Sequence, residues 1–510
     1  MRTILVVAAI VAAWPLATLT TTEPQSIATV AQRDDWRGDL DAPAAVVSAD
    51  GRYIAFTSYL GLVPADVNDR RDVYVLDCDD GRITLESLTA EGRVSSFEST
   101  HPGISADGAT IVYETMMGGD ASAGIVLRDR RSATVQVIGV ANGPTGSGWS
   151  RFPAISADGQ AVAFSSTAPH LAEAMDRSAG SHVYIYDRRG GGIRRVSLEL
   201  DREPEALPPR TNVAPSISAD GRFVAFTAAA RRGGTQPRPS HVYLRDTHLD
   251  LTRRVSGDGA GSPPDLPSWD PAISGDGRYV VFVSEAPNLA PNDRNRSQDV
   301  FLYDVQARST ELVSRSARGG SGNGRSGNPA ISVNGRFVVF QSEASDLVCA
   351  GDCAAADADI NLLWDVFLFD RQTRAVKRLS ADAREGWMEA SGGPSVDASG
   401  RVVTFSSRHP VDSSDTRNDF DLFVWTDVPP GTAAGNQGRC AAARLASART
   451  ASTIDISPIP LPIEMFWRKI RSTMDGSTRA MSSGRRPESV RSRMDARALA
   501  ETPDGFSTAK

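Results

Sequence analysis

An all-β fold assembled from one repeated unit is predicted by three features of the sequence. A phrase of the form P-x-I-S-x-D-G-R-x-V-x-F recurs seven times, at spacings of about 51 to 65 residues. An Asp-Gly or Asn-Gly pair stands in most copies, and such a pair is a strong signal for a tight hairpin turn. Short alternating apolar runs flank each turn, as they do in half-buried strands.

The seven copies place the turns at regular points along the chain. They are centred on Ser48–Gly51, Ser105–Gly108, Ser156–Gly159, Ser218–Gly221, Ser274–Gly277, Ser332–Gly335 and, in degraded form, Asp397–Gly400. We expect a type I′ turn in each copy, with positive φ at both central residues.

Each copy predicts four strands. The turn joins the first strand to the second, for example residues 53–56, and a polar loop of variable length leads to a third strand. Third strands are predicted at 72–77, 182–187 and 299–304, and fourth strands end in Arg-Val-Ser or Leu-Ser, as at 194–197 and 377–380. Four antiparallel strands in a radially repeated unit predict the blades of a β-propeller.

The two ends of the repeat array predict how it closes. The last copy stops after its third strand at 421–425, whereas residues 26–30 resemble a fourth strand without a copy of its own. We therefore expect a seven-bladed β-propeller over residues 26–427, in which the N-terminal strand completes the last blade.

The segments outside the array have other predicted roles. Met1 and Arg2 precede an apolar run from Ile4 to Trp14, which is typical of a signal peptide at about residues 1–22 and too short to span a bilayer. We expect a secreted or periplasmic protein without a transmembrane segment after signal cleavage. Residues 428–510 carry about 13 basic against about 7 acidic side chains and predict a disordered basic tail.

Charge and cysteine content narrow the classes of partner. The formal net charge is −7, and the basic tail leaves the repeat array more acidic than that value. An acidic surface repels phosphate backbones, so we expect no nucleic acid on the propeller, while cation binding is favoured. The four cysteines are too few for a disulfide-dense scaffold, although Cys349 and Cys353 are close enough in sequence to form a local bridge.

The repeat resembles that of a known family. The S-x-D-G-R-x-x-A-F phrase at residues 48–56 and the D-V-Y-x-x-D phrase at 72–77 resemble the TolB-type, WD40-like bacterial propeller repeats. The resemblance covers about residues 26–427 and implies a β-propeller fold. It does not extend to TolB itself, which carries an α/β domain ahead of a six-bladed propeller.

Acidic loops form the first candidate site. A D-x-N-x3-D pattern precedes and enters the third strand in three copies, at Asp66, Asn68 and Asp72, at Asp293, Asn295 and Asp299, and at Asp359, Asn361 and Asp365. Carboxylate and amide oxygens at short spacing suit Ca²⁺, so calcium is a candidate ligand. The alternative is structural, because Asp and Asn side chains shape turns by bonding to their own backbone.

Tryptophans form the second candidate site. Trp36, Trp149, Trp269 and Trp387 precede the first strands of their copies, and Trp364 lies between a second and a third strand. These positions predict one rim of the propeller. Aromatic side chains on a rim can anchor a partner protein or stack on sugars, and the alternative is that they pack at the seams between blades.

No catalytic motif is evident, so the leading hypothesis is an exported, monomeric, non-enzymatic propeller that binds a protein or a cell-envelope polymer through the loops of one face. The alternative is a metal-dependent lyase or hydrolase acting on a carbohydrate or lactone in the channel. It requires His or carboxylate side chains from several blades to converge, and His182 and His241, at equivalent third-strand positions, are its candidates. Replacement of Asp by His at a hydrogen-bonding position of the repeat explains the same two residues.

Overall fold

The structure is a computed structural model, and the fold is described here for part of the chain. The described residues are 26–31, 45–116, 122–139, 148–168, 171, 181–197, 214–229, 240–258, 261–348, 363–380, 391–407 and 421–427. All of them belong to Met1–Ser452, the first of two compact units of the chain. The predicted signal peptide at 1–22 and the predicted tail at 428–510 lie outside the described residues.

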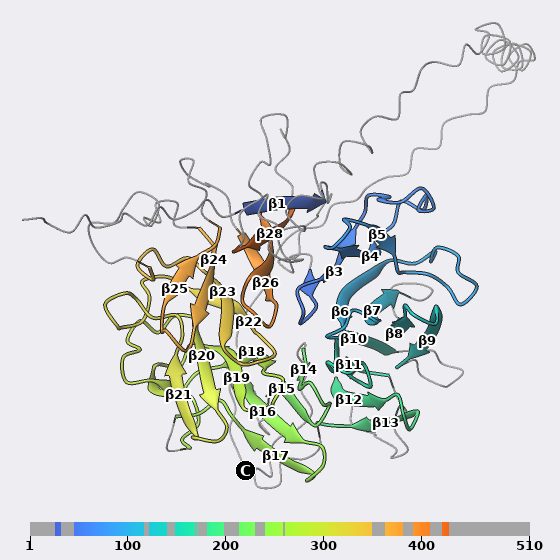
Figure 1. The fold of residues 1–510 in the computed structure, drawn as a ribbon. Helices are drawn as coiled ribbons and strands as arrows, with labels where there is room; N and C mark the ends of the chain where they lie inside the picture. Colours follow the sequence, from blue (N-terminus) through green and yellow to red (C-terminus); the bar gives the residue numbers. More distant parts are fainter. Residues whose placement is uncertain are drawn as a thin grey trace, which may run out of the picture. The chain divides into compact units, whose positions relative to one another are not determined.

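The described residues form an all-β structure of four-stranded antiparallel sheets, with one short 3-10 helix, η1 (Pro287–Leu289) (Figure 1). The first sheet contains β2 (Val46–Val47), β3 (Tyr53–Ser58), β4 (Asp72–Asp77) and β5 (Ile83–Leu85). Three later sheets repeat this order, with β14 (Ser216–Ile217), β15 (Phe223–Ala229), β16 (Ser240–Asp246) and β17 (Leu251–Arg254), then β18 (Ser268–Ile273), β19 (Tyr279–Ser284), β20 (Asp299–Asp304) and β21 (Ser309–Leu312), then β22 (Ser326–Ile331), β23 (Phe337–Ser342), β24 (Asp365–Asp370) and β25 (Val376–Arg378).

Two four-stranded groups are joined into one sheet. The first group is β6 (Ser99–Ile104), β7 (Thr110–Met116), β8 (Ser122–Asp129) and β9 (Thr134–Ile138), and the second is β10 (Gly148–Ile155), β11 (Ala161–Ser166), β12 (His182–Asp187) and β13 (Gly192–Arg195). A short parallel pairing of Gly148 with Ser122 and of Trp149 with Ala123 connects β10 to β8. Both strands have eight residues, and their extra length makes this contact.

The last sheet combines the two ends of the described chain. It contains β26 (Ser391–Val396), β27 (Val402–Ser407) and β28 (Asp421–Thr426), and β1 (Ser26–Ala31) lies beside β28 as the outermost strand. The pairing of β1 with β28 is antiparallel, from Ser26 opposite Thr426 to Ala31 opposite Leu422.

The hairpin turns differ in type from the sequence-based expectation. In the first copy Gly51 has φ of 73°, but Asp50 is not among the residues with positive φ, so the turn is not type I′. The Ser48 hydroxyl donates to Asp50 Oδ1 at 2.6 Å and accepts the Tyr53 amide at 2.9 Å. This side-chain bridge widens the loop to include Ser48, and only the glycine then needs the left-handed region.

The fourth strands also end earlier than expected. β13 ends at Arg195 and β25 at Arg378, so the Val-Ser and Leu-Ser pairs follow the strands. The reason is that the serine side chain replaces a backbone partner: Ser197 Oγ accepts the amide of Val183 at 3.0 Å, and Ser380 Oγ accepts the amide of Val366 at 2.9 Å.

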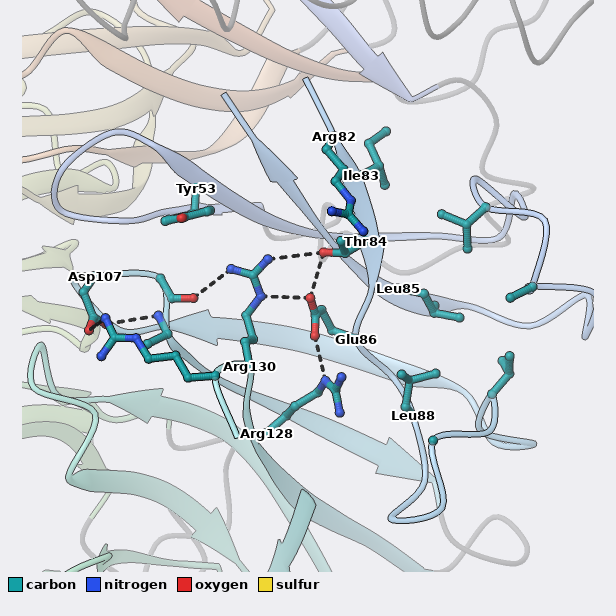
Figure 2. A pocket seen from close by; sticks show the side chains of 17 residues that line it. Tyr53, Arg82, Ile83, Thr84, Leu85, Glu86, Leu88, Asp107, Arg128 and Arg130 are labelled. Atoms are coloured by element: carbon teal, nitrogen blue, oxygen red, sulfur yellow. Dashed lines mark hydrogen bonds and ion pairs between the residues drawn. The ribbon is translucent and has the colours of Figure 1, made fainter. Parts of the chain in front are cut away.

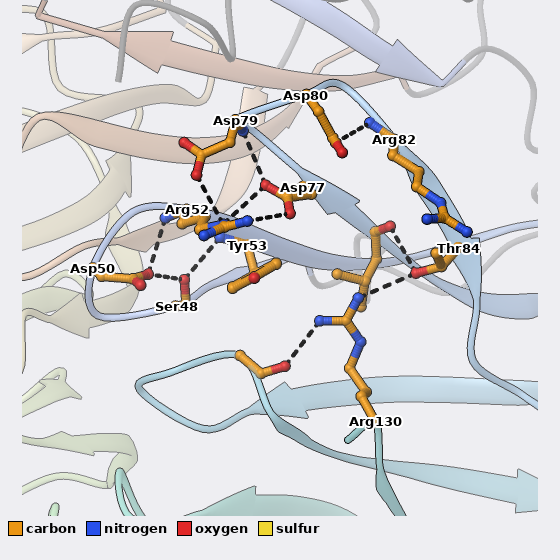
Figure 3. Close-up of polar contacts among 12 residues, drawn as sticks. Ser48, Asp50, Arg52, Tyr53, Asp77, Asp79, Asp80, Arg82, Thr84 and Arg130 are labelled. Atoms are coloured by element: carbon orange, nitrogen blue, oxygen red, sulfur yellow. Dashed lines mark hydrogen bonds and ion pairs between the residues drawn. The ribbon is translucent and has the colours of Figure 1, made fainter. Parts of the chain in front are cut away.

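An arginine of the repeat ties the hairpin to the third strand. Arg52 donates from Nε and Nη2 to the two oxygens of Asp77 at 3.0 and 2.8 Å, and its guanidinium lies over the Tyr53 ring (Figure 3). The same bidentate pairing joins Arg222 to Asp246, Arg278 to Asp304 and Arg336 to Asp370. The D-G-R phrase and the final Asp of the D-V-Y-x-x-D phrase are therefore two halves of one contact.

The hydrophobic core is divided into layers between neighbouring sheets. The buried cluster with Ile54 and Phe56 of the first sheet also contains Val402, Leu422 and Val424 of the last sheet. Six further clusters each combine residues of two sheets or groups that follow one another in sequence. Each layer therefore depends on two adjacent copies of the repeat.

A glycine of the turn allows neighbouring copies to interlock. Gly108 has φ of +67°, and a Cβ added there would lie 2.1 Å from the Tyr53 ring of the preceding sheet. Any larger side chain would therefore be strained and would also collide with Tyr53.

Two further findings concern membrane-spanning helices and cysteines. Within the described residues no helix is both long and apolar enough to cross a membrane. Cys78, buried directly after β4, is disulfide-bonded. The predicted bridge between Cys349 and Cys353 lies outside the described residues.

We predict that Asp246→Asn lowers stability at pH 5 but hardly at pH 2. The hydrogen bond from Arg222 holds the pKa of Asp246 at about 2, below its ordinary value of 3.8. The ion pair therefore stabilises the fold fully above about pH 4, and this contribution is lost as the pH falls toward 2. The urea midpoint of the variant should lie below that of the wild type at pH 5, and this difference should close near pH 2.

Arg82→Ala is the control, because Arg82 is exposed and its guanidinium has no hydrogen bond or ion pair within the described residues. It should leave the urea midpoint unchanged at both pH values. A gap for Asp246→Asn that stays constant from pH 5 to pH 2 would contradict the assignment.

Candidate functional site

The first acidic loop precedes β4, and its polar side chains satisfy one another. The backbone N–H of Asn68 donates to Asp66 Oδ1 at 3.4 Å, and the side-chain Nδ2 of Asn68 donates to Asp72 Oδ2 at 2.8 Å. The Ser87 hydroxyl donates to Asp72 Oδ1 at 2.5 Å, and the Tyr74 hydroxyl donates to Asp66 Oδ2. Burial raises the pKa of Asp72 to about 6, although both hydrogen bonds to its carboxylate oppose the shift. The three predicted residues therefore lie together.

The second acidic loop, between β19 and β20, has the same shape with fewer partners. The backbone N–H of Asn295 donates to Asp293 Oδ1 at 3.3 Å, and the side-chain Nδ2 of Asn295 donates to the carbonyl of Gly322 at 2.9 Å. The Ser314 hydroxyl donates to Asp299 Oδ1 at 2.6 Å. Burial raises the pKa of Asp293, and it raises the pKa of Asp299 to about 8 despite the bond from Ser314.

The third acidic loop is described only at its last residue. Asp359 and Asn361 lie outside the described residues. Asp365 begins β24, where it accepts the Ser380 hydroxyl at 2.5 Å and lies 3.6 Å from the Arg378 guanidinium. The buried carboxylate therefore has a cationic neighbour.

Three of the five predicted rim tryptophans are described, and each is partly exposed. Trp36 and Trp387 lie outside the described residues. Trp149 and Trp269 lie within β10 and β18, not ahead of the first strands as the sequence suggested. These strands begin earlier because a bulge at Phe152 or Asp270, where φ is positive, lets pairing continue on both sides of it.

Arginines cover two of these indole rings. Arg151 lies over Trp149 with its Cζ atom 5.4 Å from the ring centroid, and Arg325 lies over Trp364 at the same distance. Trp269 occupies in β18 the register position that Arg151 occupies in β10, two residues before the proline. Cation–π stacking restrains Arg151 and Arg325 against their indole rings.

The two candidate metal-binding histidines pack inside their own sheets. His182, which is buried, lies edge-on to Tyr184, with Nδ1 3.5 Å from the Ser197 hydroxyl. His241 lies edge-on to Tyr243 in the same way. Among the described residues, no three His, Cys, Asp or Glu side chains form a group that could hold a metal ion. The lyase or hydrolase hypothesis therefore gains no support from these two residues.

A polar cluster that sequence reasoning missed lies beside Trp149. Glu114 of β7 is 4% exposed, with Oε2 3.2 Å from His101 Nδ1 and Oε1 3.3 Å from Arg151 Nε. The ring of Phe152 packs edge-on against His101 with centroids 5.0 Å apart. We call Trp149, Arg151, Phe152, His101 and Glu114 the Glu114 cluster. It joins two strand groups through one buried carboxylate.

Strained backbone accompanies this cluster. His101 and Phe152 have φ of 50° and 54°, and each is followed by a proline at the bulge of its strand. Non-glycine residues in this region are uncommon and cluster at functional sites, where bulges redirect side chains. The X-Pro pair recurs at 101–102, 152–153, 270–271, 328–329 and 393–394, so the sequence did contain a signal for these bulges.

A cavity of about 670 Å³ lies between the first sheet and the group β6–β9. Figure 2 shows Glu86 between Arg128 and Arg130, with Nε–O distances of 2.7 and 2.8 Å. Arg131 on the same wall pairs with Asp107 at 2.8 Å. Each of these three guanidinium groups has a carboxylate partner, but Glu86 serves two of them, so the wall keeps a net positive charge.

Repeated four-stranded antiparallel sheets with buried layers between them place the chain among the all-β proteins. Solved structures that resemble the chain are TolB-like and other β-propeller proteins. TolB from Acinetobacter baumannii is 16% identical, with a TM-score of 0.37, over 70% of this chain and 67% of that chain. Oligogalacturonate lyase from Vibrio parahaemolyticus is 12% identical, with a TM-score of 0.46, over 80% of this chain and 97% of that chain.

A third similar structure is an acylaminoacyl peptidase from Pyrococcus horikoshii. It is 10% identical, with a TM-score of 0.46, over 80% of this chain and 53% of that chain, so this chain spans about half the length of the peptidase. No protein-family model matches the sequence. No curated protein matches it either.

We predict that Arg151→Met lowers the free energy of unfolding by about 2 kcal/mol, because it takes one partner from the buried Glu114 carboxylate. Adding Glu114→Gln should restore part of the loss, since no buried charge then remains. Urea unfolding of both single variants and the double variant measures the coupling.

Arg325→Met is the matched control, because Arg325 also covers a tryptophan and pairs with a glutamate but is more exposed. It should cost less than about 1 kcal/mol. Equal losses for the two arginine variants would show that burial of Glu114 has no special effect.

Proposed function

We propose that the protein is an exported seven-bladed β-propeller that binds a protein or a cell-envelope polymer through one rim. Each four-stranded group is one blade, and the eight-stranded sheet contributes two. The pairing of β1 with β28 and the core shared by the first and last sheets support closure of the ring. In this proposal the protein is a binding module and not an enzyme.

The observation that carries the binding proposal is the composition of the Glu114 cluster. Trp149, Arg151 and Phe152 lie within four residues of the chain beside one bulge, and all three are partly exposed. Tryptophan and arginine are enriched among the residues that dominate binding energy at protein interfaces. The buried Glu114 carboxylate lies within ion-pair distance of Arg151 and His101, which restricts both side chains before a partner binds.

Export is supported by the disulfide of Cys78. Structural disulfides persist in oxidising compartments such as the periplasm and the extracellular space and are rare in the cytosol. The predicted signal peptide at residues 1–22 is consistent with this location. Trp269, on the equivalent strand of another blade, extends the proposed binding rim beyond the Glu114 cluster.

The double variant Trp149→Ala and Trp269→Ala should reduce partner capture by more than about tenfold while the fold is retained. The measurement is a pull-down with the mature protein from its own envelope fraction, with circular dichroism to check folding. Leu249→Ala is the control, because Leu249 is exposed in the hairpin between β16 and β17. Unchanged capture by the folded double variant would reject this rim as the binding surface.

Removal of residues up to Ala31 should destabilise the protein and promote aggregation. β1 pairs with β28, so its removal leaves the backbone groups of β28 as an open sheet edge. Thermal unfolding and light scattering measure the two effects. Removal of Thr453–Lys510, which is a separate unit, is the control and should leave both unchanged. Equal behaviour of the two truncated proteins would argue against closure by β1.

A further inference from the structure

The acidic loops before β4 and β20 are built on the same backbone plan. The third residue of each pattern accepts a backbone amide two residues later: Arg70 donates to Asn68 Oδ1 at 2.8 Å, and Ser297 donates to Asn295 Oδ1 at 2.9 Å. The residue after that asparagine has positive φ in both loops, 53° at Asp69 and 52° at Arg296. Differences between their side-chain partners therefore do not come from a different loop shape.

The first loop has an internal donor for every carboxylate oxygen. Tyr74 donates its hydroxyl to Asp66 Oδ2, and Asn68 Nδ2 donates to Asp72 Oδ2 at 2.8 Å. These two hydrogen-bond donors lie where a cation would have to bind, and a donor cannot serve as a ligand. We expect no ion in this loop.

The second loop lacks the hydroxyl donor, and its asparagine interacts more weakly with the second aspartate. Phe301 stands in β20 where Tyr74 stands in β4, so there is no hydroxyl for Asp293. Asn68 Nδ2 donates both to Asp72 and to the carbonyl of Ser95, whereas Asn295 Nδ2 keeps only the equivalent bond to the carbonyl of Gly322. A weaker side-chain interaction of Asn295 with Asp299 lowers the pKa of Asp299. Oδ2 of Asp293 and Oδ2 of Asp299 are consequently buried without a hydrogen-bond partner in the described part of the chain.

The burial of these two oxygens makes the missing donors costly. Asp293 is 5% exposed and Asp299 is fully buried. The negative charge of Asp293 adds to burial in raising the pKa of Asp299, so the two carboxylates act on each other. Buried charges in native proteins are paired or bind metal ions, because an unpaired charge removed from water is strongly destabilising. In the third loop Arg378 supplies the positive charge beside Asp365.

We propose that the loop of Asp293, Asn295 and Asp299 binds one calcium ion, which takes the place that the Tyr74 hydroxyl fills in the first loop. Oδ2 of Asp293 and Oδ2 of Asp299 are the two anionic ligands. Backbone carbonyls and water complete the shell, which suits Ca²⁺ because this ion accepts six to eight oxygen ligands in flexible geometry. The ion stabilises the polar rim loop and does not take part in catalysis.

Calcium titration of the full mature chain tests the proposal. After removal of divalent ions with EGTA, CaCl2 is added at pH 7.4 and followed by isothermal titration calorimetry and thermal unfolding. Asp299→Asn should bind one ion fewer per chain than the wild type, and calcium should raise the melting temperature more in the wild type than in this variant. A purely structural Asp299 would give the same calcium response in both proteins.

Two further variants use the comparison between the loops. Phe301→Tyr introduces the hydroxyl that Tyr74 provides in β4, and we expect it to weaken calcium binding at this loop by more than about tenfold. Asp72→Asn is the matched control and should bind as many ions as the wild type, because the oxygens of Asp72 already have protein donors. Circular dichroism in the absence of calcium verifies that each variant is folded.

The result that overturns the proposal is equal calcium stoichiometry in the wild type and the folded Asp299→Asn variant. Absence of any calcium binding at pH 7.4 also overturns it, and would mean that a shared proton neutralises the two carboxylates. Loss of one ion in Asp72→Asn, with no loss in Asp299→Asn, would place the ion in the first loop and equally reject the assignment.

Discussion

Burial of both faces of each four-stranded sheet against two neighbouring sheets is the constraint on which the rest of the structure depends. A twisted four-stranded sheet is too small to hold a core of its own, and every hydrophobic cluster combines two adjacent copies. Stacked aromatic pairs such as Phe56 with Tyr74 and Phe282 with Phe301 fill equivalent positions in these layers. The inward-facing residues are therefore restricted by their neighbours, while the loops vary.

The start of the third strand shows how one repeated position acquires different chemistry. A serine after the fourth strand accepts the second backbone amide of the third strand, as Ser87 and Ser314 do. The first residue of the third strand, Asp72 or Asp299, accepts the hydroxyl of the same serine. The repeat thus requires a polar residue here for structural reasons. What differs between copies is the second partner, and the copy with Phe301 is the one that we infer uses an ion.

The Glu114 cluster is a different kind of departure from the repeat. Positions equivalent to Glu114 hold uncharged residues such as Ser165 and Gln341, and Gln341 Oε1 accepts the bulge amide of Gly393 at 3.2 Å. In these two sheets, the side chain at this position reaches the bulge of the next first strand. In β7 a glutamate makes that contact as an ion pair with Arg151, which places a charged, aromatic surface at the bulge. In our proposal, a local structural role and a binding surface are combined in the same contact.

The sequence by itself determined the features that depend on residues close in the chain. Third strands such as 72–77 and 299–304 have the predicted bounds, because a period of two residues is a local property of strands. The residues of the first two acidic loops lie together because Asx turns join them over a few positions. The turn type was wrong because the Ser48 side chain, which the Asp-Gly rule ignores, enters the loop.

Only the tertiary structure decided which side chains meet between copies. Glu114 and Arg151 are 37 positions apart and belong to neighbouring strand groups, and no periodicity in the sequence specifies that contact. The donors to the acidic loops were equally hidden, since the difference between Tyr74 and Phe301 matters only when the ring position relative to Asp66 or Asp293 is known. Local patterns specify strands and turns, whereas packing between sheets determines which polar atoms find partners.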